Sequence, residues 1–107
     1  MEIGVDIVDL RRLNIDHQHF IDRVLTDKEK TIFYSKKTDQ QKREFLGGRF
    51  AAKEAYSKAL GAGIGRVGFH DIEVLNDDFG KPYLNIKNAK VSISHEKDYA
   101  VAFVMIT

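Results

Sequence analysis

One stretch of the chain, residues 48–61, constrains the fold more than any other, because its composition and its ending predict a long helix. The sequence GRFAAKEAYSKALG is rich in alanine and other strong helix formers. We expect this helix to run from about Gln40 to Leu60. It should end at Gly61 and Gly63, since glycine readily adopts the left-handed conformation that closes a helix. A helix of that length spans about 30 Å, so a small domain must pack along it.

The predicted helix has one core face. At about 100° per residue, its apolar side chains gather on one side. The members of this face are Phe45, Ala52, Ala55, Tyr56 and Ala59. Glu54 and Lys58 project roughly opposite, and Arg49, Lys53 and Ser57 form a further row at four-residue spacing. Helix geometry alone favours an ordinary surface ion pair between Glu54 and Lys58, which would stabilise the helix by about 0.2–0.5 kcal/mol.

Composition limits what this helix can belong to. With 107 residues, 43% hydrophobic and 31% charged, the chain is expected to form one domain over residues 1–107, small enough that oligomerisation would add stability. The absence of cysteine excludes disulfides and thiol chemistry and favours the cytoplasm. No apolar run reaches membrane-spanning length, so we expect no membrane partner. A net charge of +1 argues against a dedicated nucleic-acid binder.

Residues 3–10 are apolar and β-branched and predict a strand that carries an acid. Alternate residues of a strand share a face, so Asp6 lies with Gly4 and Val8. An unpaired acid in such a run is costly to bury. Two interpretations remain open for Asp6. It is either a structural acid, lying on an edge strand or satisfied by a neighbouring lysine, or a metal ligand that needs a second carboxylate. The strand alone favours the structural one.

The remaining segments predict an α+β domain, with the long central helix packed on a mostly antiparallel sheet. Residues 16–37 are expected to be helical, and the capping-box pattern from Thr26 to Glu29 predicts that a new helix begins at Asp27. Strands are predicted at residues 71–75, 83–86, 91–94 and 99–106, with a turn over 76–82. His95 stands where the last hairpin enters its turn, a position where a lone histidine is usually just exposed.

Four ordered stretches together resemble the signature of the holo-acyl-carrier-protein synthases, the small members of the 4′-phosphopantetheinyl transferase superfamily. These stretches are GVDIV at 4–8, GRFAAKEAYSKA at 48–59, GKP at 80–82 and SISH at 92–95. The resemblance covers nearly the whole chain. It implies the 4′-phosphopantetheinyl transferase fold and a homotrimer with active sites between subunits. It also implies Mg²⁺-dependent transfer of 4′-phosphopantetheine from coenzyme A to a serine of apo-acyl carrier protein, releasing adenosine 3′,5′-bisphosphate, a step of fatty acid biosynthesis.

The resemblance also assigns roles to residues. Asp6 and Glu54 would hold Mg²⁺ and, with Lys58, would form the catalytic set. Mg²⁺ is typically held by one or two carboxylates together with waters and substrate phosphates. Glu54, or a water that it orients, is the candidate for taking the serine proton. Coenzyme A would be bound by Lys58, Gly61, Gly63, Gly80, Lys81, Pro82 and His95. The acidic carrier protein would dock on Arg12, Arg23 and Lys28.

A different class of function stays open beside the transferase. A non-catalytic module could use the same basic residues to bind an acidic protein or RNA. Such binding would depend strongly on salt and would be indifferent to Mg²⁺ and coenzyme A. The chain also departs from many members of the family, because only nine residues, 83–91, separate the GKP and SISH stretches. Many members insert a further short helix there, so the shape of the adenine pocket is open.

Overall fold

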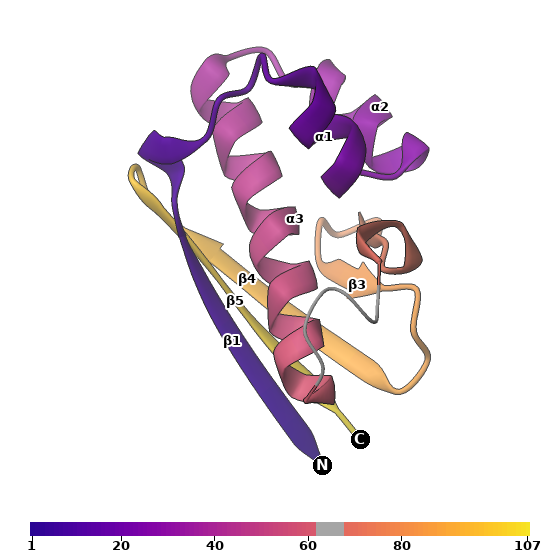
Figure 1. Ribbon diagram of the computed structural model, residues 1–107. Coiled ribbons are helices and arrows are strands. Elements are labelled where there is room, and N and C mark those ends of the chain that lie inside the picture. Colours follow the sequence, from indigo (N-terminus) through magenta and orange to yellow (C-terminus); the bar gives the residue numbers. More distant parts are fainter. Residues whose placement is uncertain (62–67) are drawn as a thin grey trace.

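The computed structural model of the chain describes residues 1–61 and 68–107, and its long helix crosses one face of an antiparallel sheet (Figure 1). In chain order the elements are β1 (Glu2–Asp9), the 3-10 helix η1 (Leu10–Arg12), α1 (Gln18–Val24), α2 (Asp27–Ser35), α3 (Asp39–Leu60), the 3-10 helix η2 (Phe69–Asp71), β2 (Val74–Asn76), β3 (Pro82–Leu84), β4 (Ala89–His95) and β5 (Tyr99–Ile106). Helices α1 and α2 gather at one end of the sheet (Figure 1). The α+β prediction is confirmed.

The strands form two antiparallel sheets where the sequence suggested one. The larger sheet has the order β1-β5-β4, and β2 pairs only with β3. Strand β5 lies in the middle because it pairs with β1 from Asp9↔Tyr99 to Glu2↔Ile106 and also with β4. This register brings the first and last strands of the chain side by side and builds the surface on which α3 lies.

Helix α3 has the ends and the core face that its sequence predicts. At its start the side chain of Thr38 accepts a hydrogen bond from Gln41 N, and Gly61 closes it in the left-handed conformation, with φ 74°. All five residues of the predicted core face are buried. Among the described residues, neither α3 nor another helix combines the length and apolarity needed to cross a membrane.

Strand β1 approaches α3 at backbone distance. A Cβ atom at Gly4 would lie 2.0 Å from the carbonyl oxygen of Ala55 and 2.7 Å from Ala59 N, so only glycine fits there. Gly4 and Val8 are buried beneath α3. Since Asp6 lies between them on the same face of the strand, its side chain is directed towards the helix.

A buried ion pair joins the helical end of the molecule to the second sheet. Lys53 and Glu29 are both fully buried, and Lys53 Nζ lies 2.6 Å from Glu29 Oε1. The same ammonium donates to Val24 O at 2.6 Å and to Phe69 O at 3.0 Å, while Glu29 Oε2 accepts from Val74 N at 2.8 Å. All three residues of the row formed by Arg49, Lys53 and Ser57 are thus buried, although two of them are cationic.

The capping box predicted at Thr26 is present, and α2 begins at Asp27 as expected. Thr26 Oγ1 accepts from Glu29 N, and Glu29 Oε1 accepts from Thr26 N at 2.9 Å. Glu29 therefore has two tasks, because the carboxylate that caps α2 also pairs with Lys53. This double use explains why a cap residue is fully buried.

The predicted strand at residues 71–75 is partly wrong. The 3-10 helix η2 covers Phe69–Asp71, and β2 begins only at Val74. Asp71 Oδ2 accepts a hydrogen bond from Gly68 N at 3.0 Å, which closes this short turn. The Phe69 carbonyl is drawn inward by Lys53, so the tight turn is fixed by a tertiary contact that local sequence does not reveal.

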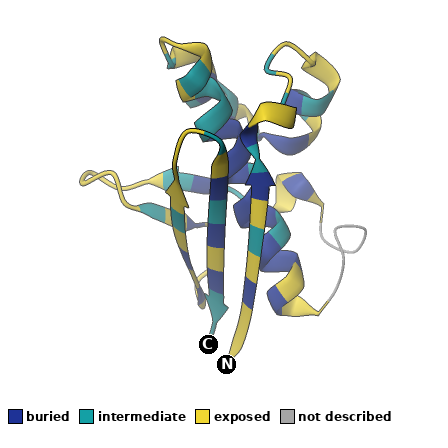
Figure 2. Cartoon of the chain, turned by 90° about the vertical axis from the view of Figure 1, so that its left-hand side faces the viewer, coloured by how far each residue is buried: buried dark blue, intermediate teal, exposed yellow. Residues whose placement is uncertain are grey.

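The face of the larger sheet that points away from α3 carries exposed residues (Figure 2), and several of them are apolar. On β1, Ile3, Val5 and Ile7 are 60%, 53% and 65% exposed, and Phe103 on β5 is 44% exposed. The sheet register pairs Val5 with Phe103 and Ile7 with Val101. These side chains therefore form one contiguous surface, which we call the outer sheet face.

Candidate active site

Asp6 and Lys58 meet where β1 passes α3. Lys58 Nζ donates to Asp6 Oδ1 at 2.9 Å and to Val5 O at 3.1 Å. The Lys58 side chain is 56% exposed, whereas that of Asp6 is only 16% exposed. The Asp6 carboxylate is thus mostly buried, and the ammonium bound to it belongs to a largely exposed side chain. The structural interpretation of Asp6, an acid satisfied by a neighbouring lysine, describes this contact correctly.

Glu54 lies one turn before Lys58 on α3 and is half-buried. Burial raises the pKa of its carboxyl, and the nearby negative charge of Asp6 raises that pKa further, while Lys58 and Arg23 act in the opposite direction. The two carboxylates therefore share one electrostatic environment, which two cations border. An arrangement of this kind can bind a metal ion and an anionic substrate together.

The donors at Asp6 and Glu54 fit Mg²⁺ better than a metal held wholly by protein. Within residues 1–61 and 68–107, no group of three or more His, Asp or Glu side chains forms a metal cluster. Mg²⁺ needs only one or two carboxylates, because waters and substrate phosphates complete its shell. Asp6 already binds a cation in the form of the Lys58 ammonium. The residues present therefore suit a hard cation that arrives with a phosphate.

His95 and Gly80 border a second region, distant in sequence from Asp6. His95 ends β4, and its Nδ1 lies 3.5 Å from Glu44 Oε2. A cavity of about 700 Å³ lies here, and its lining includes Gly80, His95, Lys36 and Arg49. Lys37 and the Glu44 carboxylate line it as well, so three lysine or arginine side chains and His95 face the hollow together with one acid. The excess of cationic groups suits an anionic ligand.

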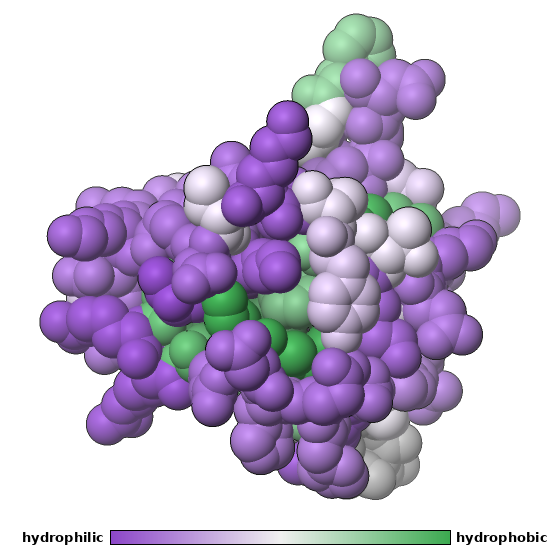
Figure 3. All heavy atoms as spheres, turned by 90° about the horizontal axis from the view of Figure 1, so that it is seen from above, coloured by the Kyte–Doolittle hydropathy of each residue, from purple (hydrophilic) through white to green (hydrophobic). Residues whose placement is uncertain are grey.

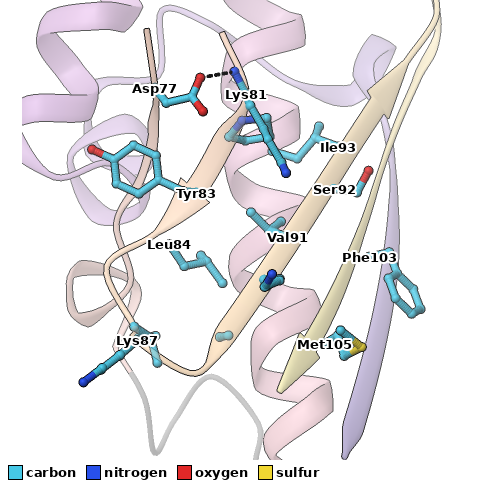
Figure 4. Close-up of a pocket in the computed structure, with 14 residues that line it drawn as sticks. Asp77, Lys81, Tyr83, Leu84, Lys87, Val91, Ser92, Ile93, Phe103 and Met105 are labelled. Carbon is cyan, nitrogen blue, oxygen red and sulfur yellow. Dashed lines mark hydrogen bonds between the residues drawn. The ribbon is translucent and has the colours of Figure 1, made fainter. Parts of the chain in front are cut away.

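Lys81 and Pro82 line a neighbouring cavity of about 680 Å³ between β3 and β4 (Figure 4). The backbone N–H of Lys81 donates to Asp77 Oδ1 at 2.9 Å, and Gly80 has a φ of 84°. These features hold the GKP loop in a tight turn. In Figure 4 the Lys81 side chain runs into the space between the strands, while Lys87 points away from it.

Arg49 was not predicted as a site residue, yet its guanidinium borders the cavity of His95. Its Cζ lies 4.1 Å from the centre of the Phe45 ring, its Nε donates to Val74 O at 3.2 Å, and Asn76 accepts from its Nη2. Burial lowers the pKa of Arg49 to about 10. The sequence signal was the spacing of Arg49, Lys53 and Ser57 on α3, but spacing alone does not separate a buried cation from an exposed one.

The predicted site residues fall into two groups within one chain. Asp6, Glu54 and Lys58 form the first group, and Gly61 ends the same helix. Gly80, Lys81, Pro82 and His95 form the second group, around cavities whose linings contain no member of the first. Gly63, predicted to bind coenzyme A, lies outside the described residues. A single chain therefore does not bring all the described candidates to one place.

The basic residues predicted to dock a partner lie at the end that carries η1, α1 and α2. Arg12, Arg23 and Lys28 are all exposed. Figure 3 looks down on this end and shows hydrophilic side chains around a central apolar patch. Arg23 differs from the other two, because its Cζ lies 5.6 Å from the centre of the Phe69 ring. The surface can attract an acidic partner and also offers it an apolar contact.

Comparison with known proteins gives one consistent result. A sequence model of the ACPS family, described as the 4′-phosphopantetheinyl transferase superfamily, matches residues 2–104. A holo-[acyl-carrier-protein] synthase from Geobacillus sp. (strain WCH70) is 53% identical, over 97% of this chain and 93% of that relative. A synthase of the same name from Anoxybacillus flavithermus is 52% identical, over 97% and 92%.

Solved structures agree with the sequence relatives. The holo-(acyl-carrier-protein) synthase of Bacillus anthracis, solved in complex with CoA (3′,5′-ADP), superposes with a TM-score of 0.90 at 47% identity and covers 98% of this chain and 94% of that one. The Helicobacter pylori synthase in complex with coenzyme A gives a TM-score of 0.84 at 31% identity, over 98% and 99%. Both likenesses extend over the whole architecture described above.

Proposed function

The chain belongs to the 4′-phosphopantetheinyl transferase superfamily, and we propose that it acts as a holo-[acyl-carrier-protein] synthase, which transfers 4′-phosphopantetheine from coenzyme A to a serine of apo-acyl carrier protein. The observation that carries this proposal is the meeting of Asp6, Glu54 and Lys58 at the crossing of β1 and α3. The reaction releases adenosine 3′,5′-bisphosphate. We assign the reaction to fatty acid biosynthesis. We also propose that the protein acts in the cytoplasm, the compartment that its cysteine-free sequence favours.

Each residue of the first group has a chemical task in this reaction. Lys58 can move from Asp6 to the diphosphate of coenzyme A, because its side chain is largely exposed. Its positive charge then stabilises the charge that develops on the leaving phosphate. Glu54, or a water that it orients, is the candidate for taking the serine proton.

Asp6 and Glu54 are the residues that would hold Mg²⁺. When bound, Mg²⁺ supplies charge neutralisation and alignment of the coenzyme A diphosphate. The two carboxylates approach from different elements, β1 and α3, so the site they form opens towards solvent at Lys58. This geometry leaves room for the phosphates that complete the shell of a hard cation.

The second group of residues is proposed to bind the nucleotide end of coenzyme A. Gly80 and His95 border the cavity that Arg49 also lines, and Lys81 and Pro82 border the adjoining one. The positive charges of Arg49 and Lys81 suit the phosphate of the nucleotide. Lys58 and Gly61 at the end of α3 are proposed to bind the rest of coenzyme A, together with Gly63, which lies outside the described residues.

Transfer should be visible directly by mass. Incubation of the protein with apo-acyl carrier protein, coenzyme A and Mg²⁺ is expected to add one phosphopantetheine group, detected by mass spectrometry. Coenzyme A should also raise the melting temperature, because a ligand that binds only the native state stabilises it. Folded protein that adds no such mass, and whose binding of carrier depends on salt alone, would favour the non-catalytic binding module.

We further propose that the enzyme is a homotrimer assembled through the outer sheet face. Ile3, Val5, Ile7 and Phe103 form an exposed contiguous apolar patch, and such patches can mark protein–protein contacts. His95 lies at the border of this face, since a hollow of about 300 Å³ is lined by Ile7, His95, Tyr99 and Val101 among others. Association at this face would let His95 approach the Asp6 group of a neighbouring subunit, which one chain alone does not achieve.

Substitution on the outer sheet face should change the assembly. Ile7→Glu is expected to convert a trimer into monomers, because it places a charge in the apolar contact. Light scattering measures the mass. Phe79→Glu is the matched control, since Phe79 is almost fully exposed in the turn before Gly80 and away from this face. A wild-type protein that is strictly monomeric would contradict the proposal.

A further inference from the structure

Glu44 is an acid in a cavity that the proposed function gives to an anion. It lies in the second turn of α3 and lines the same cavity as Lys36, Arg49 and His95. A carboxylate in such a place repels a phosphate, so its presence needs a physical reason. Within the described part of the chain its one ion-pair partner is His95, whose Nδ1 lies 3.5 Å from Glu44 Oε2. The acid therefore contacts the histidine and leaves the lysine and arginine charges of the cavity to a ligand.

The same part of α3 also holds the main chain that follows His95. Gln40 lies one turn before Glu44, and its Nε2 donates to Glu44 Oε2 at 3.1 Å and to Lys97 O at 2.9 Å. Lys97 belongs to the turn between β4, which ends at His95, and β5. One amide thus fixes the carboxylate and ties the turn to the helix. The ring of His95 and the backbone beside it are both held against the start of α3.

The contact decides which nitrogen of His95 remains for a ligand. A carboxylate only accepts hydrogen bonds, so the imidazole nitrogen that faces Glu44 is the one that carries a proton. Nδ1 is therefore directed at the helix, and no hydrogen bond between described residues uses Nε2. The bond that one ring nitrogen makes sets the state of the other. When the ring carries a second proton, Nε2–H is a charged donor, the kind that binds phosphate oxygens most strongly.

We propose that Glu44 is a positioning residue for the binding of coenzyme A, which holds His95 through Nδ1, with its own carboxylate fixed by Gln40, so that Nε2 is left for a phosphate of the nucleotide. The proposal rests on the proposed function, because it needs the nucleotide end to lie in the cavity of His95. A donor that is already held in place loses less freedom when the ligand binds. An acid can in this way strengthen the binding of an anion.

The direction of one change separates this role from a plain charge effect. Glu44→Gln keeps the size of the side chain and removes its charge. An acid that merely lines an anion site would repel the ligand, so its loss would tighten binding. We expect the opposite: coenzyme A and adenosine 3′,5′-bisphosphate should each bind about fivefold or more weakly, measured by isothermal titration calorimetry with Mg²⁺ and without carrier protein.

Asp39→Asn is the matched control for charge. Asp39 is an exposed acid in the first turn of the same helix, so the variant makes the same change of net charge away from His95. The affinity for coenzyme A should stay within about twofold of the wild type, because solvent and salt screen an exposed charge.

Two further measurements show whether the effect passes through His95. In a His95→Ala protein, Glu44→Gln should cause no further loss of affinity, since residues that act through one contact are not additive. Nitrogen-15 NMR of the ligand-free wild type should show neutral His95 protonated at Nδ1, and Glu44→Gln should remove that preference. The spectrum of His95→Ala identifies the signal among the four histidines.

The outcomes distinguish this proposal from the proposed function. A wild type that binds coenzyme A, with a Glu44→Gln protein that binds it as tightly or more tightly, would overturn the role of Glu44 and leave the transferase standing. Neutral His95 protonated at Nε2 in the wild type would overturn that role as well. A folded wild type that binds no coenzyme A would contradict the proposed function, and the role of Glu44 with it.

Discussion

Replacing Glu54 with glutamine is expected to abolish phosphopantetheine transfer, lowering the rate by about a thousandfold or more. Glutamine keeps the size of the side chain and one acceptor oxygen, but it removes the negative charge and the basicity. Asp6→Asn should have an effect of similar size, because it removes the other carboxylate and its ion pair with Lys58. The measurement is the rate of mass addition to apo-acyl carrier protein over a range of Mg²⁺ concentrations.

Both variants should remain folded, because neither side chain belongs to the buried core. Circular dichroism and thermal unfolding check this. Glu2→Gln provides the control, since Glu2 lies on the same strand and the same face as Asp6 but is exposed at the strand's start. If Glu54→Gln or Asp6→Asn retained nearly the wild-type rate at every Mg²⁺ concentration, the metal assignment would be wrong.

The second large effect concerns stability. Lys53→Met is expected to lower the free energy of unfolding by about 3–5 kcal/mol, because it leaves the Glu29 carboxylate buried without its cation. The carbonyls of Val24 and Phe69 lose their donor at the same time. Urea unfolding measures the change. A substantial fraction of the stability of a domain this small would be lost.

Two comparisons make the stability prediction specific. Lys53→Met combined with Glu29→Gln should be less destabilising than the sum of the single changes, since no unpaired charge remains. Lys37→Met removes an exposed lysine just before α3 and should change the free energy of unfolding by less than about 0.5 kcal/mol. A Lys53→Met protein as stable as Lys37→Met would show that the buried pair contributes nothing.

Local sequence predicted the elements whose signals are local. The alanine-rich periodicity and Gly61 gave the extent and the core face of α3, and the capping box gave the start of α2. The position of Lys53 could not be predicted in this way. A lysine ordinarily marks a solvent-exposed position, and its burial depends on Glu29, 24 residues away in sequence. The turn of η2 was missed for the same reason, since the carbonyl of Phe69 is held by Lys53.

For the candidate site, alternation along β1 correctly put Asp6 on one face with Gly4 and Val8, but it did not say what that face meets. The resemblance to a family supplied the pairing with Glu54, and the roles of both residues remain predictions. The separation of His95 from Asp6 was not visible from residue types, because it depends on how the strands are ordered in the sheet. Arg49 was missed as a site residue because helical spacing does not report burial.

The contact at Gly4 sets how far the candidate metal site can change. At Gly4 the backbone of β1 rests against the carbonyl of Ala55, so at that position no side chain lies between the strand and the helix that carry Asp6 and Glu54. The separation of the two carboxylates is thus limited by the main chain, which substitutions of neighbouring side chains cannot easily alter. Attempts to adapt this site to a larger cation would have to change the lengths of the two acidic side chains. The distance between strand and helix is already set by the main-chain contact at Gly4.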